Sequence, residues 1–302
     1  MDRGLYVEAR ICGPLDRVWE LTQNPALHQR WDLRFSTITY LPRPDLEEPQ
    51  KFLYTTQIGF GIEVQGTGES IATRTASDDV QISSLRFWSS EKLSLITEGS
   101  GYWKYIPSGN QIVTFLTWYD YRTRFGIWGR LADVAFRPLL GWATAWSFDR
   151  LRLWVEDGCP PETVRAMSLI YAIARLMVVF VWLWHGLVPK LSFHDGDEIR
   201  MLVDVAPHLS SPASTLNLFG IAEVIVGIAG LLFWRWRTYL LLTAIGMIFA
   251  LAMVAARSPQ YIHHAFNPVT LNLCVLALSA VAWWAWRYSA FAGRCLRRPK
   301  KA

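Results

Sequence analysis

The sequence predicts two domains of different class: an α+β domain over residues 1–157 and an all-α bundle of four transmembrane helices over residues 165–290. Its length of 302 residues suits two domains. Charges and turn residues are spread evenly up to about residue 160, whereas four long apolar runs follow. The mean hydropathy of +0.17 averages these two unlike halves. A soluble domain followed by a membrane domain is therefore the expected organisation.

The first half begins as a strand followed by two helices. Residues 5–11 (LYVEARI) alternate between apolar and polar side chains, which is typical of a strand. Pro14 and Asp16 then mark a helix start, because proline suits the first turn and an acidic residue follows it. Helical segments are expected at residues 16–23 and 25–31.

A series of strands and one long helix complete the predicted α+β domain. The long helix is expected from about Phe125 to Glu156, with a break or kink at Pro138. Turn residues separate the strand-like segments that precede it. These segments are residues 35–41, 51–58, 62–76, 80–88, 91–99, 101–106 and 111–124.

This order of elements resembles the SRPBCC superfamily, also called START-like or polyketide-cyclase-like, over about residues 3–157. Residues 6–9 (YVEA) and 14–19 (PLDRVW) are similar to that family's first strand and helix. Asn24-Pro25 and Trp31-Asp32 are similar to the segment that closes its second helix. The resemblance implies a helix-grip fold, in which an antiparallel curved sheet surrounds a long C-terminal helix. It also implies an apolar cavity between sheet and helix for a lipid, sterol, polyketide or similar ligand.

Aromatic and polar side chains supply the candidate pocket of this domain. Its nine tryptophans suit a pocket wall and a dense core equally. The polar groups among these tryptophans either form a structural network or act on a ligand, by orienting it or by acid–base chemistry. His28, Asp32 and Asp149 are the candidates for acid–base chemistry. The expected ligand-binding residues are His28, Trp31, Asp32, Arg34, Tyr102, Lys104, Tyr119, Trp142, Trp146 and Asp149.

Four segments of the second half are long and apolar enough to cross a bilayer, which needs about 20 residues. They are residues 167–188, 216–234, 238–256 and 269–286. Arginines and lysines flank one side of these segments, including Arg235, Arg237 and the basic tail 291–302, whereas the loop 190–211 on the other side is acidic. This asymmetry places both termini in the cytoplasm. The chain start also lacks the apolar core of a secretory signal, so a multi-pass protein of the inner membrane is expected.

Four polar residues within the predicted spans are candidate intramembrane site residues: Arg175, His185, Glu223 and Asn272. Arg175 and Glu223 are expected about 12 and 16 Å from the inner ends of their spans, at 1.5 Å per residue. We expect them to form an ion pair, because a pair costs far less than two separate charges in low dielectric. The pair either fixes helix register or takes part in binding or proton movement. His185 and Asn272 are expected near the outer ends.

The membrane half resembles the DoxX-like family over about residues 165–290. The matching residues are 184–191 (WHGLVPKL), the span that contains Glu223, and Phe266-Asn267-Pro268 through Leu271-Asn272. Some relatives of that wider family are membrane subunits of thiosulfate:quinone oxidoreductase. The resemblance therefore implies that a quinone is a candidate cofactor.

Known catalytic and cofactor motifs are missing from the sequence. It contains no nucleophile elbow, zinc-protease, phosphate-loop or dinucleotide-binding signature. Its four cysteines form no CxxC pair, so no metal site or disulfide framework is expected. The basic residues near the spans suit anionic lipid better than nucleic acid.

Three functions follow as hypotheses. The first is a non-enzymatic membrane protein whose cytoplasmic domain binds a hydrophobic small molecule, such as a lipid, isoprenoid or quinone, for transfer or sensing. The second is a membrane subunit of a quinone-linked oxidoreductase. The third is a cyclase- or dehydratase-like enzyme. The expected partners are membrane lipids, the hydrophobic ligand and, for the second hypothesis, a redox or membrane protein.

Overall fold

A computed structural model describes residues 4–43, 45, 48–59, 61–74, 80–109, 111–265 and 267–299 of the chain. It divides into two compact units: unit 1 contains residues 1–165 and 290–302, and unit 2 contains residues 166–289. Phe266, used above in a family motif, and Lys300 and Lys301 of the basic tail lie outside the described residues.

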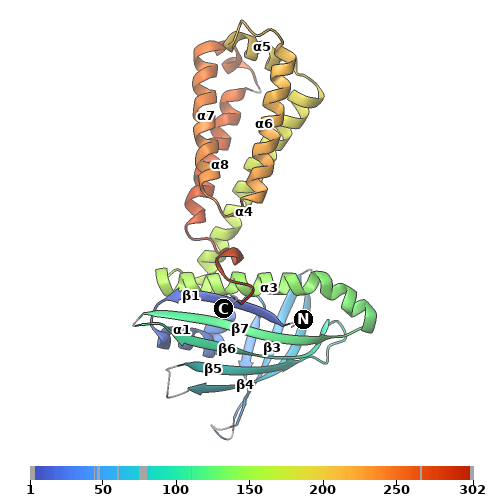
Figure 1. Ribbon diagram of the computed structural model, residues 1–302, viewed down its shortest axis with the longest axis vertical. Helices are drawn as coiled ribbons and strands as arrows, with labels where there is room; N and C mark the ends of the chain where they lie inside the picture. The colour runs from blue at the N-terminus through green and yellow to red at the C-terminus, as the bar shows by residue number, and fades with distance from the viewer. Residues whose placement is uncertain are drawn as a thin grey trace. The chain divides into compact units, whose positions relative to one another are not determined.

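Seven antiparallel strands among these described residues form the sheet of unit 1, in the order β1-β7-β6-β5-β4-β3-β2. Successive strands of the chain from β2 to β7 are neighbours, and β1 closes the sheet beside β7 (Figure 1). The strands are β1 (Leu5–Cys12), β2 (Thr37–Tyr40), β3 (Gln50–Gly59), β4 (Ile62–Arg74), β5 (Gln81–Trp88), β6 (Ile96–Pro107) and β7 (Ile112–Thr123).

The sequence predicted two strands where the structure has the single strand β6. Its pairing with β7 continues from Glu98 to Pro107 through the glycines that were expected to break it. A Cβ atom on Gly99 would lie 2.3 Å from the Phe87 ring, and one on Gly101 would lie 2.3 Å from Tyr119 Cβ. These glycines therefore allow neighbouring side chains to lie close to the backbone, and they do not end the strand.

Three helices of unit 1 accompany the sheet: α1 (Leu15–Gln23), α2 (Pro25–Trp31) and α3 (Gly126–Asp157). Figure 1 shows α3 lying across the sheet, and its closest strand contacts are with β1. The predicted break at Pro138 is wrong, because α3 continues through this residue. Proline cannot bond the carbonyl of Val134 four residues earlier. Both residues are exposed, so this carbonyl need not be buried without a partner.

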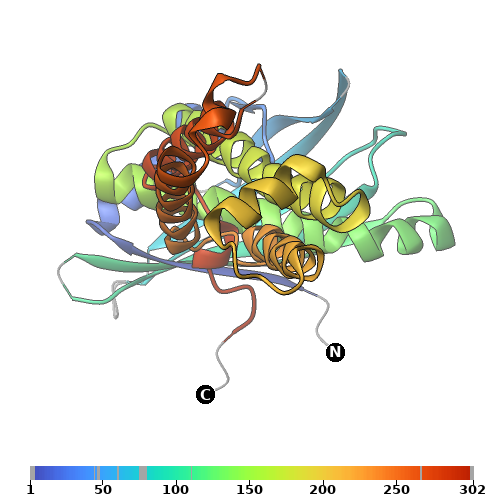
Figure 2. The same cartoon turned by 90° about the horizontal axis from the view of Figure 1, so that it is seen from above.

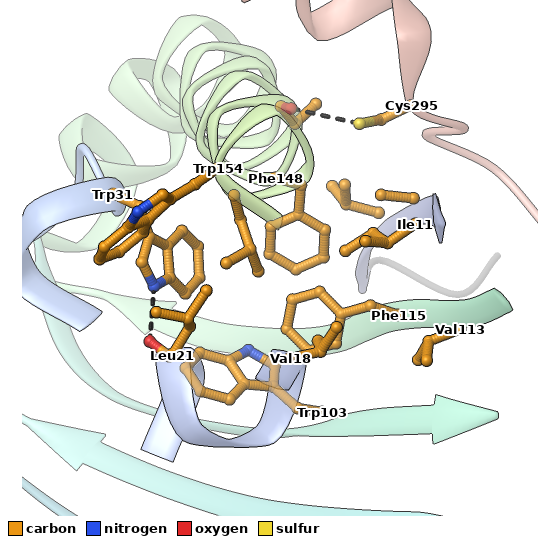
Figure 3. Close-up of a cluster of buried hydrophobic side chains, with 14 of the residues drawn as sticks. Ile11, Val18, Leu21, Trp31, Trp103, Val113, Phe115, Phe148, Trp154 and Cys295 are labelled. Carbon is orange, nitrogen blue, oxygen red and sulfur yellow. Dashed lines mark hydrogen bonds between the residues drawn. The ribbon is translucent and has the colours of Figure 1, made fainter. Parts of the chain in front are cut away.

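The hydrophobic core of unit 1 lies between α3, the two short helices and the inner face of the sheet (Figure 3). Side chains of alternate strand residues point inward, as the two-residue period of a strand requires. The indole of Trp31 is fully buried, and its Nε1 donates a hydrogen bond of 2.9 Å to the carbonyl of Leu21. Phe115 of β7 stacks on Phe148 of α3 with ring centroids 4.4 Å apart.

The C-terminal segment also packs in unit 1, although the sequence analysis treated residues 291–302 as a tail. Leu296 and Glu8 of β1 exchange two backbone hydrogen bonds of 2.9 Å. Cys295 joins the buried core, and its thiol donates to the carbonyl of Ala145 over 3.3 Å (Figure 3). The short helix η3 (Ala292–Arg294) precedes these contacts. The described part of the segment thus adds a further element to the α+β domain.

Within the described residues, four helices are long and apolar enough to cross a membrane, as predicted: Pro161–Ser192, Pro212–Leu232, Thr238–Arg257 and Pro268–Trp286. The first contains α4 (Pro161–His185) and the π-helix η1 (Gly186–Ser192), and the others are α6, α7 and α8. Figure 2 shows these helices nearly end-on. The short helices α5 (Gly196–Val205) and η2 (Pro259–His263) lie in the two loops that connect α4 to α6 and α7 to α8.

Candidate functional site

Three of the predicted site residues form a buried charged network at the end of α2. Asp32 caps this helix and is 1% exposed. Arg34 binds its carboxylate with two parallel hydrogen bonds, Nε to Oδ1 at 2.9 Å and Nη2 to Oδ2 at 2.6 Å. His28 Nε2 lies 3.0 Å from Asp32 Oδ2, one helical turn away. A two-pronged arginine contact of this kind fixes both the position and the plane of the carboxylate.

The electrostatics of this network favour a neutral histidine beside an ionised carboxylate. Burial lowers the pKa of His28 below its ordinary value of 6.5, and the nearby Asp32 only partly offsets this effect. Burial alone would raise the pKa of Asp32, but Arg34 and the hydrogen bond with His28 outweigh it and hold this pKa well below its usual range. Neutral His28 must then donate its Nε2 proton to Asp32, which leaves Nδ1 as a proton acceptor.

An internal cavity of about 30 Å³ lies on the inner side of the sheet, and His28 forms part of its wall. Phe35, Ile38, Phe52 and Trp103 contribute apolar surface. Polar groups come from α1, β2, β4 and β5. The polar lining residues are Thr22, Gln23, Tyr40, Ser70 and Ser83.

Apart from His28, the polar residues of this cavity wall were not among the site residues predicted from the sequence. Thr22 and Gln23 both contact the hydroxyl of Tyr105, at 2.8 and 2.9 Å. Ser83 Oγ lies 3.4 Å from the side-chain oxygen of Gln23. One signal was available: Gln81 and Ser83 occupy the inward positions of β5, where alternation would otherwise require apolar side chains.

The structure brings together only part of the predicted soluble pocket. Tyr119 joins the network from β7, since the Arg34 guanidinium lies 5.5 Å from its ring centroid and its hydroxyl bonds Thr144 at 2.8 Å. Trp31 is a core residue in contact with His28. Tyr102 and Lys104 alternate with the buried Trp103 and Tyr105, so their side chains leave the opposite face of the sheet. For these two residues the pocket prediction is wrong, because the strand period sets them outside.

Three predicted pocket residues on α3 also lie elsewhere. Trp142 and Trp146 stack on each other with centroids 6.3 Å apart, and Trp142 is exposed. Asp149 is buried and accepts hydrogen bonds from Phe291 N at 2.7 Å, from Arg152 at 2.7 Å and from Arg294 at 3.1 Å. Its carboxylate therefore holds the C-terminal segment and does not face the cavity.

A larger groove of about 340 Å³ lies on the outer face of the sheet. Tyr102 and Trp118 stack in its wall with centroids 6.3 Å apart, and Glu69 and Arg86 supply charges 3.9 Å apart. This groove has no histidine in its wall among the described residues. It is a second place where a small molecule could contact unit 1.

In unit 2 the predicted ion pair between Arg175 and Glu223 is wrong. The Arg175 guanidinium instead donates to the carbonyls of Gly230, Phe233 and Trp236, at 2.9, 2.8 and 3.3 Å. These carbonyls lie at and just beyond the C-terminus of α6, where the last carbonyls of a helix lack their usual intrahelical partners. The helix dipole also gives this end a partial negative charge. Arginine binds this helix end and needs no carboxylate.

Glu223 pairs with a lysine that the sequence analysis did not consider. Lys190 Nζ lies 3.2 Å from Glu223 Oε2 and 3.1 Å from Glu198 Oε1. Lys190 belongs to η1, a π-helix, which is a rare element that often marks a functional position. His185 ends α4 just before this element, and Asn272 lies in the second turn of α8. Among the described residues, no cluster of His, Cys, Asp and Glu could hold a metal ion.

The strand order, the long helix and the four bilayer-length helices define a membrane protein that carries a helix-grip domain. Residues 179–280 match the DoxX-like family. The chain is 51% identical over 183 residues to the uncharacterized membrane protein YndG of Bacillus subtilis (strain 168). The aligned region covers 60% of this chain and 68% of YndG. The chain therefore belongs to the family of this membrane protein.

Unit 1 is also similar to solved structures of low sequence identity. The protein TTHA0849 from Thermus thermophilus is 16% identical, with a TM-score of 0.40 over 50% of this chain and 96% of its own. A STAR-related lipid transfer protein from Xanthomonas axonopodis is 14% identical, with a TM-score of 0.39 over 50% and 85% of the two chains. The Zhui aromatase/cyclase from Streptomyces is 14% identical, with a TM-score of 0.33 over 41% and 69%. The helix-grip assignment rests on the strand order and register of unit 1.

Proposed function

We propose that unit 1 binds a hydrophobic small molecule on the inner side of its sheet, and that the chain uses this binding for transfer or sensing at a membrane. The observation that supports it is the cavity wall itself. Apolar rings of Phe35, Phe52 and Trp103 surround a few polar groups, and His28, which burial favours in its neutral form, is oriented by its hydrogen bond to Asp32. Ligand sites typically combine an apolar lining with a small number of oriented polar groups.

The cavity must widen to admit such a ligand. A volume of about 30 Å³ accommodates roughly one water molecule. The strand β2 has four residues and lies at the sheet edge, where it pairs with β3. Short edge elements open at low cost in free energy. Displacement of β2 would move Ile38 and Tyr40 away from the cavity, so we propose that the ligand enters at this edge.

The membrane setting limits the class of ligand. Lipids, isoprenoids and quinones are hydrophobic molecules that a bilayer supplies to a domain connected directly to four spans. The arginines that flank the spans support a topology with both termini in the cytoplasm and the protein in the inner membrane. A quinone site at Arg175 is a weaker alternative, because the guanidinium already donates to three carbonyls and to the hydroxyl of Tyr171.

Acid–base catalysis is a second candidate function, favoured by the pairing of His28 with Asp32. A neutral histidine oriented by a carboxylate is a common general base. A cyclase- or dehydratase-like reaction would need a substrate whose acidic proton reaches the free nitrogen of His28. Replacement of His28 by Gln would then abolish turnover and retain ligand binding, whereas a binding protein would show no turnover with either side chain.

The first experiment is solvent extraction of the purified full chain, followed by mass spectrometry of the bound molecules. Ser83→Leu adds bulk inside the cavity, and Ser84→Leu adds the same bulk on the outer face of the same strand, at the outer groove. We expect the first variant to lose the ligand and the second to retain it. Loss in Ser84→Leu alone would move the site to the outer groove, and equal occupancy in both variants would reject a site in unit 1.

A further inference from the structure

The first half of α3 exposes an apolar stripe that its own domain does not cover. Its members lie one, three or five residues apart along the helix, and they are 43% to 76% exposed. This spacing places them along one side of the helix over four turns. The stripe consists of Ile127, Trp128, Leu131, Val134, Leu139 and Trp142.

Two of the three charged residues of the same helix segment, Asp133 and Arg137, point the other way, whereas Arg130 is exposed. Arg137 binds Asp133 at 2.9 Å and Asp120 of β7 at 2.7 Å, and Asp133 also accepts from the hydroxyl of Tyr121 at 2.5 Å. These side chains are mostly shielded. A helix on a water-exposed surface has its charges outward and its apolar side chains inward. Here the order is reversed, which indicates that the stripe faces a medium other than water.

Chain connectivity favours a lipid bilayer as that medium. Three residues, Gly158 to Pro160, separate the end of α3 from the first membrane-capable helix, and three residues cover at most about 11 Å. The segment after the fourth such helix also returns to α3, where Phe291 N and Arg294 bind Asp149. The second half of α3 is thus connected at two places to chain that enters a bilayer.

We propose that the stripe from Ile127 to Trp142 lies in the interface of the same bilayer that the chain spans, with the helix parallel to the membrane surface. Helices of this type insert an apolar face at the boundary between headgroups and acyl chains. Tryptophan favours this depth, and Trp128 and Trp142 lie near the two ends of the stripe. The exposed Arg130, Arg297 and Arg298 would attract anionic headgroups. This proposal does not depend on ligand binding in unit 1.

Spin labelling of the full chain in vesicles tests the proposal. The vesicles contain phosphatidylcholine with about one quarter phosphatidylglycerol, since anionic lipid strengthens binding of basic interfacial segments. The exposed cysteines Cys12 and Cys274 are first replaced by serine. This double variant, without an added cysteine, measures the background labelling of the buried Cys159 and Cys295. A label is then placed at Leu131→Cys or Val134→Cys. Leu53→Cys is the control, because Leu53 is an exposed apolar residue of β3 that alternates with the inward Phe52 and so lies on the outer face of the sheet.

The readout is collision of each label with oxygen, which concentrates in lipid, and with a water-soluble nickel chelate. We expect the labels at 131 and 134 to show about fivefold lower nickel accessibility than the label at 53, together with higher oxygen accessibility, as interfacial burial requires. Equal nickel accessibility at all three positions would overturn the proposal. Low accessibility to both reagents with spin–spin broadening would also overturn it, by showing that a second copy of the chain covers the stripe.

Discussion

Asp149 and Arg150 are neighbours on α3, and each holds one of the two chain segments that connect unit 1 to the membrane helices. Asp149 binds the segment after α8 through Phe291 N at 2.7 Å. Arg150 Nη2 donates to the carbonyl of Pro161 in the first turn of α4 at 3.0 Å and to that of Arg30 at 2.8 Å. Both side chains are buried. Two adjacent charges at one point of α3 thus secure both connections within unit 1.

Replacement of Asp149 by alanine should release the C-terminal segment. The change leaves the buried N–H of Phe291 and the Arg294 guanidinium without their carboxylate, at a cost of about 3 kcal/mol. A cost of this size raises the open population of the segment roughly a hundredfold. We expect trypsin to cleave the full chain after Arg294 and Arg297 correspondingly faster, as measured by mass spectrometry of the released peptide.

Asp157→Ala is the control for this prediction, because Asp157 ends the same helix in an exposed position. Its cleavage rate should equal that of the unsubstituted chain. If Asp149→Ala also left the rate unchanged, the carboxylate would not hold the segment.

The contacts of Arg175 and Glu223 predict a pattern of energetic coupling. Gly230 and Glu223 are seven residues apart on α6, which corresponds to about 10 Å along the helix, and Arg175 binds at the Gly230 end. Arg175→Gln and Glu223→Gln should therefore destabilise the full chain additively, within about 0.5 kcal/mol. Lys190→Gln and Glu223→Gln should be coupled by about 1 kcal/mol or more, because their side chains form a shielded ion pair.

Unfolding of the purified chain in detergent, followed for single and double variants, measures both couplings. The additive pair Arg175 and Glu223 is the internal control for the coupled pair Lys190 and Glu223. Coupling between Arg175 and Glu223 would indicate that these two side chains form the ion pair predicted from the sequence, and it would contradict the observed contacts.

The stability of unit 1 should fall on acidification, beginning near pH 6.5. The folded state lowers the pKa of His28, so below 6.5 the unfolded chain takes up a proton that the folded chain does not. The free energy of unfolding then decreases by at most about 1.4 kcal/mol per pH unit. Asp32, whose folded-state pKa is also lowered, adds a second loss below about pH 4.

Hydrogen exchange of peptides from α2, corrected for the intrinsic pH dependence of exchange, measures this effect in the full chain. His28→Asn should reduce the slope between pH 6.5 and 5, because it removes the titrating group. His208→Asn, at an exposed position of unit 2, should not change it. An unchanged slope in His28→Asn would mean that another group causes the loss.

Local patterns in the sequence were sufficient for the order of elements and for the four spans. Alternation predicted β1 and the run of strands, and apolar length predicted α4, α6, α7 and α8. The division of β6 failed because Gly99 and Gly101 look like turn residues in sequence, whereas in the sheet they accommodate the Phe87 ring and Tyr119. Glycine in a strand has both uses, and only the neighbouring strands decide between them.

The site was harder to predict because contacts between distant segments define it. The proximity of His28, Asp32 and Arg34 in sequence made their grouping visible, and Tyr119 joins them only through the fold. Tyr102 and Lys104 were assigned to the wrong face because the register of β6 was unknown. The sequence suggested Glu223 as the partner of Arg175, because it is the only carboxylate at a similar depth in the predicted spans. The true acceptors are backbone carbonyls at a helix end, and residue types do not reveal which carbonyls are available.

The close approach of η1 to α6 depends on two glycines, and substitution of one should separate the helices. A Cβ atom on Gly186 would lie 2.6 Å from the carbonyl oxygen of Gly220 and 2.9 Å from the Val224 side chain. A backbone carbonyl cannot move aside as the end of a flexible side chain can. Small residues at the contacts of membrane helices allow the two backbones to lie close together. We expect Gly186→Ala to destabilise the full chain in detergent by about 1–3 kcal/mol, the usual cost of overpacking. Gly196→Ala, where an added Cβ meets no atom within 4 Å, should leave the unfolding midpoint unchanged or slightly higher. If the two variants unfolded alike, the contact between Gly186 and Gly220 would not limit the packing of these helices.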